Sequence, residues 1–224
     1  MIWFSHILHK LATIQNHIFS EVLDSLHSFY WGRDMKSLED KILQDGKVFP
    51  GGVLKVGSFL NHQIDVPFMK EIGKEFYRLF KDEHITKILT IETSGSAIAV
   101  ICASEFEVPV VFAKKHQTKN LTNDCYMAQI HSYTHGNDYQ ARVEKQFLVP
   151  EDRVLIIDDF LANGAALDGL LEIIDQAGAH LAGCGIVIEK AFQDGGKRLR
   201  EKGVRIESLA RIAEMTEDGT ITFC

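Results

Sequence analysis

The stretch RVLIIDDFLANGAA, residues 153–166, decides the fold. It contains an apolar run, 154–157, and such a run bounded by charge is typical of a strand buried on both faces of a parallel sheet. Two adjacent carboxylates, Asp158 and Asp159, end the run, and a loop of small residues then leads into a helical pattern. Strands and helices alternate from Lys87 onward, which predicts an α/β fold with a central parallel sheet flanked by helices.

The loop after the acidic pair has the features of an anion site. It carries no bulky side chain, so a ligand can approach its backbone closely. The helix that follows directs its free N–H groups and the positive end of its dipole at whatever the loop holds. The two carboxylates beside this anion site could hold hydroxyl groups or a metal-bound group, and a phosphate beside a diol describes a phosphorylated sugar. The residues of this loop are Ala162, Asn163, Gly164, Ala165 and Ala166.

Length and composition limit the classes of protein to consider. A chain of 224 residues suits one α/β domain with or without an appendage. A formal net charge of −7 argues against a dedicated nucleic-acid binder. No apolar run in the sequence approaches the roughly 20 residues of a membrane span. The four cysteines form no CxxC pair, and we expect a cytoplasmic protein whose thiols stay reduced.

Residues 1–34 differ in character from the rest of the chain. Their apolar residues recur at helical spacing, as in an amphipathic helix, and the segment lacks the features of a secretory or mitochondrial targeting peptide. It is either an oligomerisation or docking helix, or a non-native extension ahead of Met35, and we favour the second interpretation. We therefore divide the chain into an extension, 1–34, and a domain, 35–224. Ser37 is the expected cap of a short helix at the start of this domain.

A second strand, loop and helix precede the acidic stretch. The apolar strand 87–91 is followed by Thr93, Ser94 and Gly95 and then by an apolar helix. This loop also suits an anion, but it matches neither a Walker loop nor a GxGxxG fingerprint. Taken alone, an ordinary βα turn is the better interpretation. The next strand, 108–113, delivers Lys114 and Lys115 at its carboxyl end, where ligands bind in open parallel sheets.

Three polar features have no clear role from the pattern alone. The segment 117–136 is polar, and a long polar loop inside a compact domain is often a lid; its histidines lack the spacing of zinc ligands. Asn61 belongs to a polar run after a short strand, 53–56, and by itself this run favours a turn held by side-chain hydrogen bonds. Lys190 ends an apolar strand, where it either pairs with Glu189 or reaches over the ligand.

The stretch 154–166 resembles the motif with which type I phosphoribosyltransferases bind phosphoribosyl diphosphate (PRPP). Two further stretches, VLKVGSFLNHQ at 53–63 and GIVIEK at 185–190, are similar to those of bacterial members of this family that act on xanthine. The resemblance extends from about Met35 to the end of the chain. It implies a type I phosphoribosyltransferase fold with a flexible hood loop, 117–136, and a small purine-recognition region.

The resemblance also implies roles along the PRPP molecule. The loop 162–166 would cradle its 5′-phosphate, and the candidate catalytic residues, Asp158 and Asp159, would lie against the ribose hydroxyls. The residues 93–95, with Lys114 or Lys115, would face the pyrophosphate group.

The purine would contact three residues from distant parts of the sequence, namely Leu54, Asn61 and Lys190. A cationic donor such as Lys190 suits a 6-oxo group, and an amide such as Asn61 can read the 2-oxo group of xanthine. The implied reaction converts xanthine and PRPP to xanthosine 5′-monophosphate and pyrophosphate. Mg²⁺ would bind mainly through substrate oxygens and water, with no direct protein ligand expected. A homodimer is implied as well.

Several positions depart from the family pattern, and these bear on catalytic rate or PRPP affinity more than on fold. Gly57 replaces an expected acid, Ser96 and Ile98 replace an Ile and a Pro, and Asn123-Asp124 inverts the usual order. Two alternatives stay open: a guanine or hypoxanthine enzyme, and a non-catalytic PRPP-sensing regulator. A regulator of that kind needs a DNA-binding domain, for which residues 1–34 are too short and too poor in basic side chains.

Overall fold

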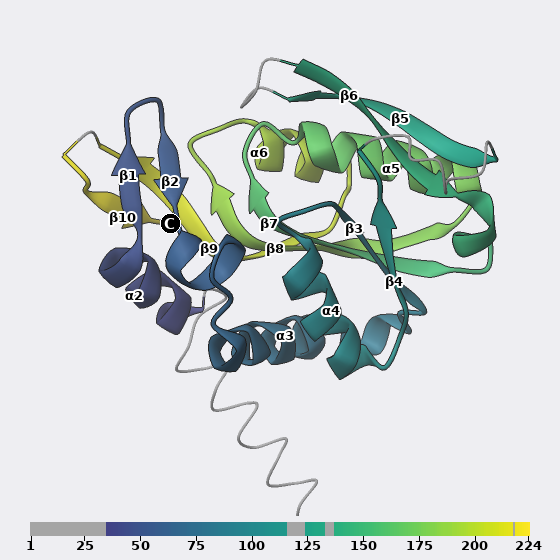
Figure 1. The fold of residues 1–224 in the computed structure, drawn as a ribbon, viewed down its shortest axis with the longest axis horizontal. Helices are drawn as coiled ribbons and strands as arrows, with labels where there is room; N and C mark the ends of the chain where they lie inside the picture. Colours follow the sequence, from purple (N-terminus) through teal and green to yellow (C-terminus); the bar gives the residue numbers. More distant parts are fainter. Residues whose placement is uncertain (1–34, 116–123, 133–136, 217) are drawn as a thin grey trace, which may run out of the picture. The chain divides into compact units, whose positions relative to one another are not determined.

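The computed structural model describes residues 35–115, 124–132, 137–216 and 218–224 (Figure 1). Residues 37–224 form one compact unit, which contains the central sheet and the helices that cover it. No helix in the described ranges is long and apolar enough to cross a membrane.

A six-stranded sheet lies at the centre, in the order β10-β9-β8-β7-β3-β4. The neighbouring strands β4, β3, β7, β8 and β9 pair in parallel, and β10 pairs with β9 in the antiparallel sense. The strands in spatial order are β10 (Ile221–Phe223), β9 (Ile206–Met215), β8 (His180–Lys190), β7 (Arg153–Leu161), β3 (Lys87–Ile91) and β4 (Val110–Ala113). The parallel sheet predicted from the sequence is therefore confirmed, with an antiparallel strand added at one edge.

Helices cover both faces of this sheet (Figure 1). On one face lie α3 (Val66–Phe80) and α4 (Ser96–Phe106), and on the other lie α5 (Ala165–Ala177) and α6 (Gly195–Glu201). Because the sheet is covered twice, the interior of β7 is buried almost throughout, as its apolar run predicts. Asp65 caps α3 by accepting a 3.2 Å hydrogen bond from the amide of Phe68. Gly178, in the left-handed conformation, ends α5.

The segment expected to be a hood loop is partly a strand. β5 (Cys125–Ser132) and β6 (Asn137–Glu144) form an antiparallel hairpin that packs on α5. Gly169 of α5 permits this contact, because a Cβ there would lie 2.5 Å from side-chain atoms of Ile130. Ala128 and Ile130 face inward and their neighbours outward, an alternation that the polar flanks obscure in the sequence. The rest of the predicted hood, 117–123 and 133–136, lies outside the described residues.

A smaller region precedes α3. It contains α2 (Lys36–Asp45), the antiparallel pair β1 (Lys47–Phe49) and β2 (Val53–Lys55), and a π-helical turn, η1 (Gly57–Asn61). Ser37 lies inside α2, so its expected role as the cap is wrong, because the helix begins one residue earlier. Short 3₁₀ turns, η2 (Lys81–Glu83) and η3 (Lys145–Phe147), complete the elements.

The direction of chain growth reverses between β3 and β7. From β3 the chain continues to β4 on one side, whereas β7, β8 and β9 extend the sheet on the other. In an open parallel sheet, the crevice outside the carboxyl ends of the two strands at such a reversal is where ligands bind. The acidic pair and the residues 93–95 both lie at this point.

Candidate active site

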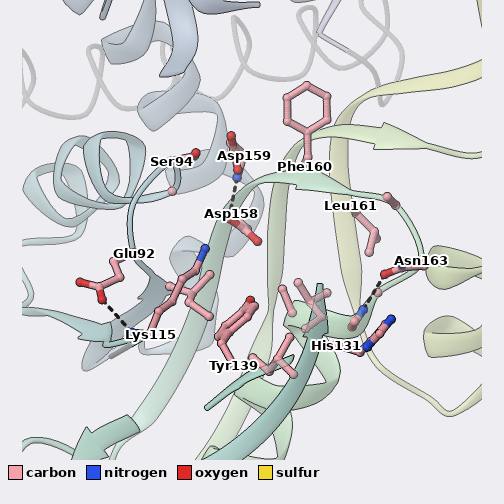
Figure 2. A pocket seen from close by; sticks show the side chains of 18 of the residues that line it. Glu92, Ser94, Lys115, His131, Tyr139, Asp158, Asp159, Phe160, Leu161 and Asn163 are labelled. Carbon is pink, nitrogen blue, oxygen red and sulfur yellow. Dashed lines mark hydrogen bonds between the residues drawn. The ribbon is translucent and has the colours of Figure 1, made fainter. Parts of the chain in front are cut away.

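A cavity of about 890 Å³ opens at the reversal point (Figure 2). Segments that follow β3 and β7 form much of its wall, and the hairpin β5–β6 and Lys115 supply the remainder. Its lining comprises Ile91, Glu92, Thr93, Ser94, Gly95, Lys115, Ile130, His131, Asp138, Tyr139 and residues 158–167. The sequence-derived PRPP candidates therefore converge on one cavity, with the exception of Lys114.

The acidic pair at the end of β7 is almost completely buried. Asp158 is 5% exposed and Asp159 is 8% exposed. The amide of Asp159 donates a 3.0 Å hydrogen bond to Oδ1 of Asp158. Burial raises the pKa of Asp158 well above its ordinary value, and the charge of Asp159 adds to this effect. Burial also raises the pKa of Asp159, against the effect of a hydrogen bond from Asn61.

The loop after β7 takes the form expected of an anion site. Gly164 has a φ of +86°, a conformation that other residues rarely adopt. Its carbonyl accepts a 2.9 Å hydrogen bond from the amide of Asp168, so α5 begins directly after it. The amide of Ala165 donates to Oδ1 of Asn163 over 3.0 Å. The first turn of α5 therefore faces the cavity with its N-terminus, which favours a bound anion.

The loop after β3 packs against the acidic pair. A Cβ at Gly95 would lie 2.8 Å from Oδ1 of Asp158 and would also collide with the hydroxyl of Thr90. The space between the two loops therefore admits glycine at position 95. Among the described residues, Thr90 Oγ1 is buried and has no hydrogen-bond partner. The loop begins with a cis peptide bond between Glu92 and Thr93.

The two lysines after β4 point in different directions. Lys115 lines the cavity, with its ammonium 5.1 Å from the ring of Tyr139 and directed toward Asp158 (Figure 2). Lys114 lines a separate cavity of about 680 Å³ and pairs with Glu92 at 3.3 Å. The alternation of side chains along an extended backbone explains the difference. Of the two candidates, the geometry favours Lys115 as the pyrophosphate neighbour.

Two of the three purine candidates, Asn61 and Lys190, contact residues that line the cavity, although none of the three belongs to its lining. Asn61 Nδ2 donates a 3.2 Å hydrogen bond to Oδ2 of Asp159. Lys190 Nζ donates to the carbonyl of Gly52 over 2.8 Å and lies 5.7 Å from the centre of the Phe160 ring. Burial lowers the pKa of Lys190. Gly52 directly precedes β2, the strand that carries the buried Leu54.

Lys190 does not form the ion pair with Glu189 that the sequence left open. Glu189 is 2% exposed. Its carboxylate accepts hydrogen bonds from both terminal nitrogens of Arg200, each at 2.7 Å, and from the hydroxyl of Ser208. Burial by itself would raise the pKa of Glu189, but these hydrogen bonds lower it below its ordinary value. Successive side chains of β8 point to opposite faces of the sheet, which separates the two charges.

Several residues that line the cavity were not singled out from the sequence, and three of them carry aromatic rings. Phe160 follows the acidic pair directly, and an aromatic side chain there was the available signal. Tyr139 lies on β6, and its pKa is raised by burial and then by the charge of Asp158. His131, interpreted from the sequence as a solvated loop residue, lies on β5 and is hydrogen-bonded to Asp138. The alternation of β5, which was not recognised from the sequence, hid His131.

The positions that depart from the family pattern have ordinary surroundings where they are described. Gly57 begins η1, where a Cβ would lie 3.3 Å from that of His62. Ser96 is the first residue of α4, and Ile98 is completely buried in the same helix. Asp124 pairs with Lys145 at 2.6 Å. Asn123 lies outside the described residues.

The carboxylates of the site can be compared with the needs of a divalent cation. Across the described ranges, no group of three or more His, Cys, Asp or Glu side chains could hold a metal ion. Mg²⁺ commonly binds through one or two carboxylates together with substrate phosphates and water. The described residues therefore offer no all-protein cage, and Mg²⁺ at this site would rely mainly on oxygens of the substrate and water.

Comparison with known proteins now adds the family. The model of the phosphoribosyl transferase domain matches residues 61–208, and this span includes both loops of the cavity. The chain belongs to the phosphoribosyltransferase family. Its relatives include the xanthine phosphoribosyltransferase of Bacillus cytotoxicus, 57% identical over 84% of this chain and 95% of the relative. The protein of the same name from Bacillus cereus is 56% identical over the same shares. The resemblance inferred from the three sequence stretches is confirmed.

Solved structures of phosphoribosyltransferases share the fold. The adenine phosphoribosyltransferase of Giardia lamblia superimposes with a TM-score of 0.66 at 24% identity, covering 78% of this chain and 97% of the other. That of Trypanosoma brucei gives a TM-score of 0.65 at 20% identity, covering 78% and 79%. The predicted type I phosphoribosyltransferase fold is thus confirmed for the domain.

Proposed function

We propose that this phosphoribosyltransferase converts xanthine and PRPP to xanthosine 5′-monophosphate and pyrophosphate in purine salvage. The observation that carries the proposal is the buried acidic pair, which leads directly into an anion loop at the reversal point of the sheet. The names of relatives that are 56–57% identical favour xanthine as the base.

PRPP extends across the cavity in this proposal. Its 5′-phosphate binds to the loop 162–166, where the N-terminus of α5 and the glycine backbone suit an anion. The ribose lies against Asp158 and Asp159. The pyrophosphate group lies against the residues 93–95 and Lys115, on the other wall of the same cavity.

The purine lies beside the acidic pair, near the ring of Phe160. Asn61 and Lys190 supply the polar recognition and Leu54 an apolar contact. Lys190 is already held by Gly52, and Asn61 by Asp159, so both donors are positioned before the base arrives. Lys190 donates to the 6-oxo group and Asn61 reads the 2-oxo group, which distinguishes xanthine from hypoxanthine.

The acidic pair stabilises positive charge on the ribose during transfer. Burial raises the pKa of both carboxylates, and repulsion by the charge of Asp159 raises the pKa of Asp158 further. Positive charge that develops at the anomeric carbon relieves this repulsion, so the pair favours the transition state over the ground state. Mg²⁺ would be held mainly by substrate oxygens and water and would supply positive charge that balances the departing pyrophosphate. The walls of the cavity exclude water that would otherwise hydrolyse PRPP.

Three further parts of the proposal concern the whole protein. It acts as a homodimer, as the family resemblance implies. It works in the cytoplasm, which agrees with four free cysteines, three of them buried. The segment 117–136, which lies only partly within the described residues, acts as the hood over PRPP.

Release of pyrophosphate tests the proposed reaction. The full chain is supplied with PRPP and Mg²⁺ and with xanthine, guanine or hypoxanthine in turn, and turnover should be fastest with xanthine. Faster turnover with another base would replace the substrate and keep the reaction. Tight PRPP binding without turnover of any base would refute the enzyme and favour a PRPP-sensing regulator.

A further inference from the structure

The helix α6 is fixed to the anion loop by close backbone contact. A Cβ at Gly195, the first residue of α6, would lie 2.6 Å from the amide nitrogen of Gly164 and would collide with the carbonyl of Ala162. A Cβ at Gly164 would in turn lie 3.3 Å from Cα of Gly195. The two segments therefore meet with no room for a side chain between them.

Arg198 of α6 holds this loop through three hydrogen bonds. Its Nη2 donates to the carbonyl of Asn163 over 3.1 Å and to Oδ2 of Asp168 over 2.5 Å. Its Nη1 donates to Oδ1 of Asp168 over 3.0 Å. The guanidinium thus spans the loop and the first turn of α5, and a paired fork of this kind fixes geometry as well as charge.

The negative charge of Asp168 lies close to the proposed phosphate site. It lies in the first turn of α5, where a carboxylate favours the bare helix N-terminus but opposes a phosphate at the same place. Arg198 compensates that charge from the side away from the cavity, since neither residue belongs to the described lining. Lys202, 3.9 Å from Oδ1 of Asp168, contributes less.

The other attachment of α6 is to the sheet. Arg200, two residues after Arg198, forms a paired hydrogen bond with the buried Glu189 of β8. A Cβ at Gly196 would collide with that carboxylate. Because α6 is anchored in this way, Arg198 acts from a fixed support.

We infer that Arg198 is a positioning residue for the 5′-phosphate subsite, an inference that rests on the proposed binding of PRPP to the loop 162–166. It orients the Asn163 carbonyl away from the cavity, so that the amides of the loop are presented to the phosphate. It also neutralises Asp168, whose charge would otherwise repel the ligand.

The test uses the two halves of PRPP as separate probes for the full chain. Arg198→Leu should weaken binding of ribose 5-phosphate about tenfold, the loss expected for one charge-assisted hydrogen bond, and should leave pyrophosphate binding unchanged. The KM for PRPP should rise by a similar factor, with kcat within about threefold. Arg198→Lys, which keeps the charge without the fork, should give an intermediate loss and stays informative if the Leu variant does not fold.

A double substitution separates charge from geometry. Adding Asp168→Asn to Arg198→Leu should recover part of the lost ribose 5-phosphate affinity, because the repelling charge is gone. Lys197→Leu, a control on the exposed side of α6, should change nothing. Unchanged ribose 5-phosphate affinity in Arg198→Leu, or equal loss of both probes, would overturn the inference. Failure of the proposed enzyme function would give a different result. The unsubstituted protein would then bind both probes and show no turnover.

Discussion

Replacing Asp158 by Asn should stabilise the protein while removing its activity. The substitution keeps the size of the side chain, and the new amide oxygen can still accept the hydrogen bond from the amide of Asp159. The one large change is loss of a buried negative charge beside another. At an effective dielectric constant of about 20, like charges about 4–6 Å apart repel by roughly 3–4 kcal/mol. Partial protonation relieves much of this, and we expect a net gain of about 1–2 kcal/mol at pH 8.

The pH dependence of this gain has a defined sign. Because the pKa of Asp158 is raised in the folded state, the folded protein binds more protons than the unfolded chain between the ordinary and the raised pKa. The free energy of unfolding of the unsubstituted protein therefore falls as pH rises through that window. The advantage of Asp158→Asn should be close to zero below the ordinary pKa of an aspartate and complete above the raised one.

Asp152 offers a matched control with the opposite expectation. It is 7% exposed and precedes β7 at the end remote from the cavity. It pairs with Lys87 at 2.8 Å and accepts from the amide of Val149. Burial by itself would raise its pKa, but these partners lower it. The stability that it contributes is present above the ordinary pKa and is lost as pH falls through the lowered one. Asp152→Asn should cost about 1–3 kcal/mol at pH 8 and keep activity.

Thermal unfolding between pH 5 and pH 8, together with release of pyrophosphate, measures both variants. For a chain of this length 1 kcal/mol corresponds to about 2–4 °C in Tm, so Asp158→Asn should unfold about 3–6 °C higher at pH 8. Activity should fall by at least about 100-fold, since the pair acts on charge that develops in the transition state. A lower Tm for Asp158→Asn at pH 8, or shifts of the same sign in both variants, would refute the electrostatic account.

Three other substitutions test separate parts of the structure. Lys190→Met should raise the KM for xanthine by about tenfold or more and leave the Kd for PRPP unchanged, and equal losses in steady-state and binding assays would contradict its assignment to the base. Gly195→Ala should lower stability by about 1–3 kcal/mol and weaken ribose 5-phosphate binding, because the added methyl group would collide with the carbonyl of Ala162. Unchanged binding in titration calorimetry would contradict the proposed link between α6 and the anion loop. Glu189→Gln should cost about 3 kcal/mol at pH 7, and in denaturant titrations this cost should shrink as pH falls through the lowered pKa of Glu189.

Local patterns were sufficient to predict the elements that carry the PRPP candidates. The apolar runs of β3, β7 and β8 and the glycine and aspartate signals at helix ends all act over a few residues, so they can be interpreted without the rest of the fold. Strand β5 was missed because its inward alternation, at Ala128 and Ile130, is embedded in polar sequence, whereas the alternation of residues 139–147 does indicate the strand β6. Its role depends on packing against Gly169, which lies far away in the chain.

Contacts between distant segments are what the sequence could not predict. Whether Lys114 or Lys115 faces the cavity depends on which residues of the preceding strand point to that side of the sheet. An error of one residue in this assignment would exchange the two lysines. The support that α6 gives to the anion loop depends on Arg198 reaching Asn163, 35 residues earlier. The base candidates Asn61 and Lys190 came from resemblance alone, since a polar run and a lysine at a strand end have many ordinary explanations.

The geometry also changes the meaning of the acidic pair. In the sequence Asp158 and Asp159 look equivalent, but they are consecutive residues of β7 and so point in different directions. Asp158 faces Gly95, Lys115 and the PRPP side of the cavity, whereas Asp159 accepts the amide of Asn61 on the side of the purine candidates. In the proposed mode of binding, Asp159 would connect the sugar to Asn61, the candidate that reads the base, and Asp158 would connect it to the leaving group. We therefore expect that neither carboxylate can substitute for the other.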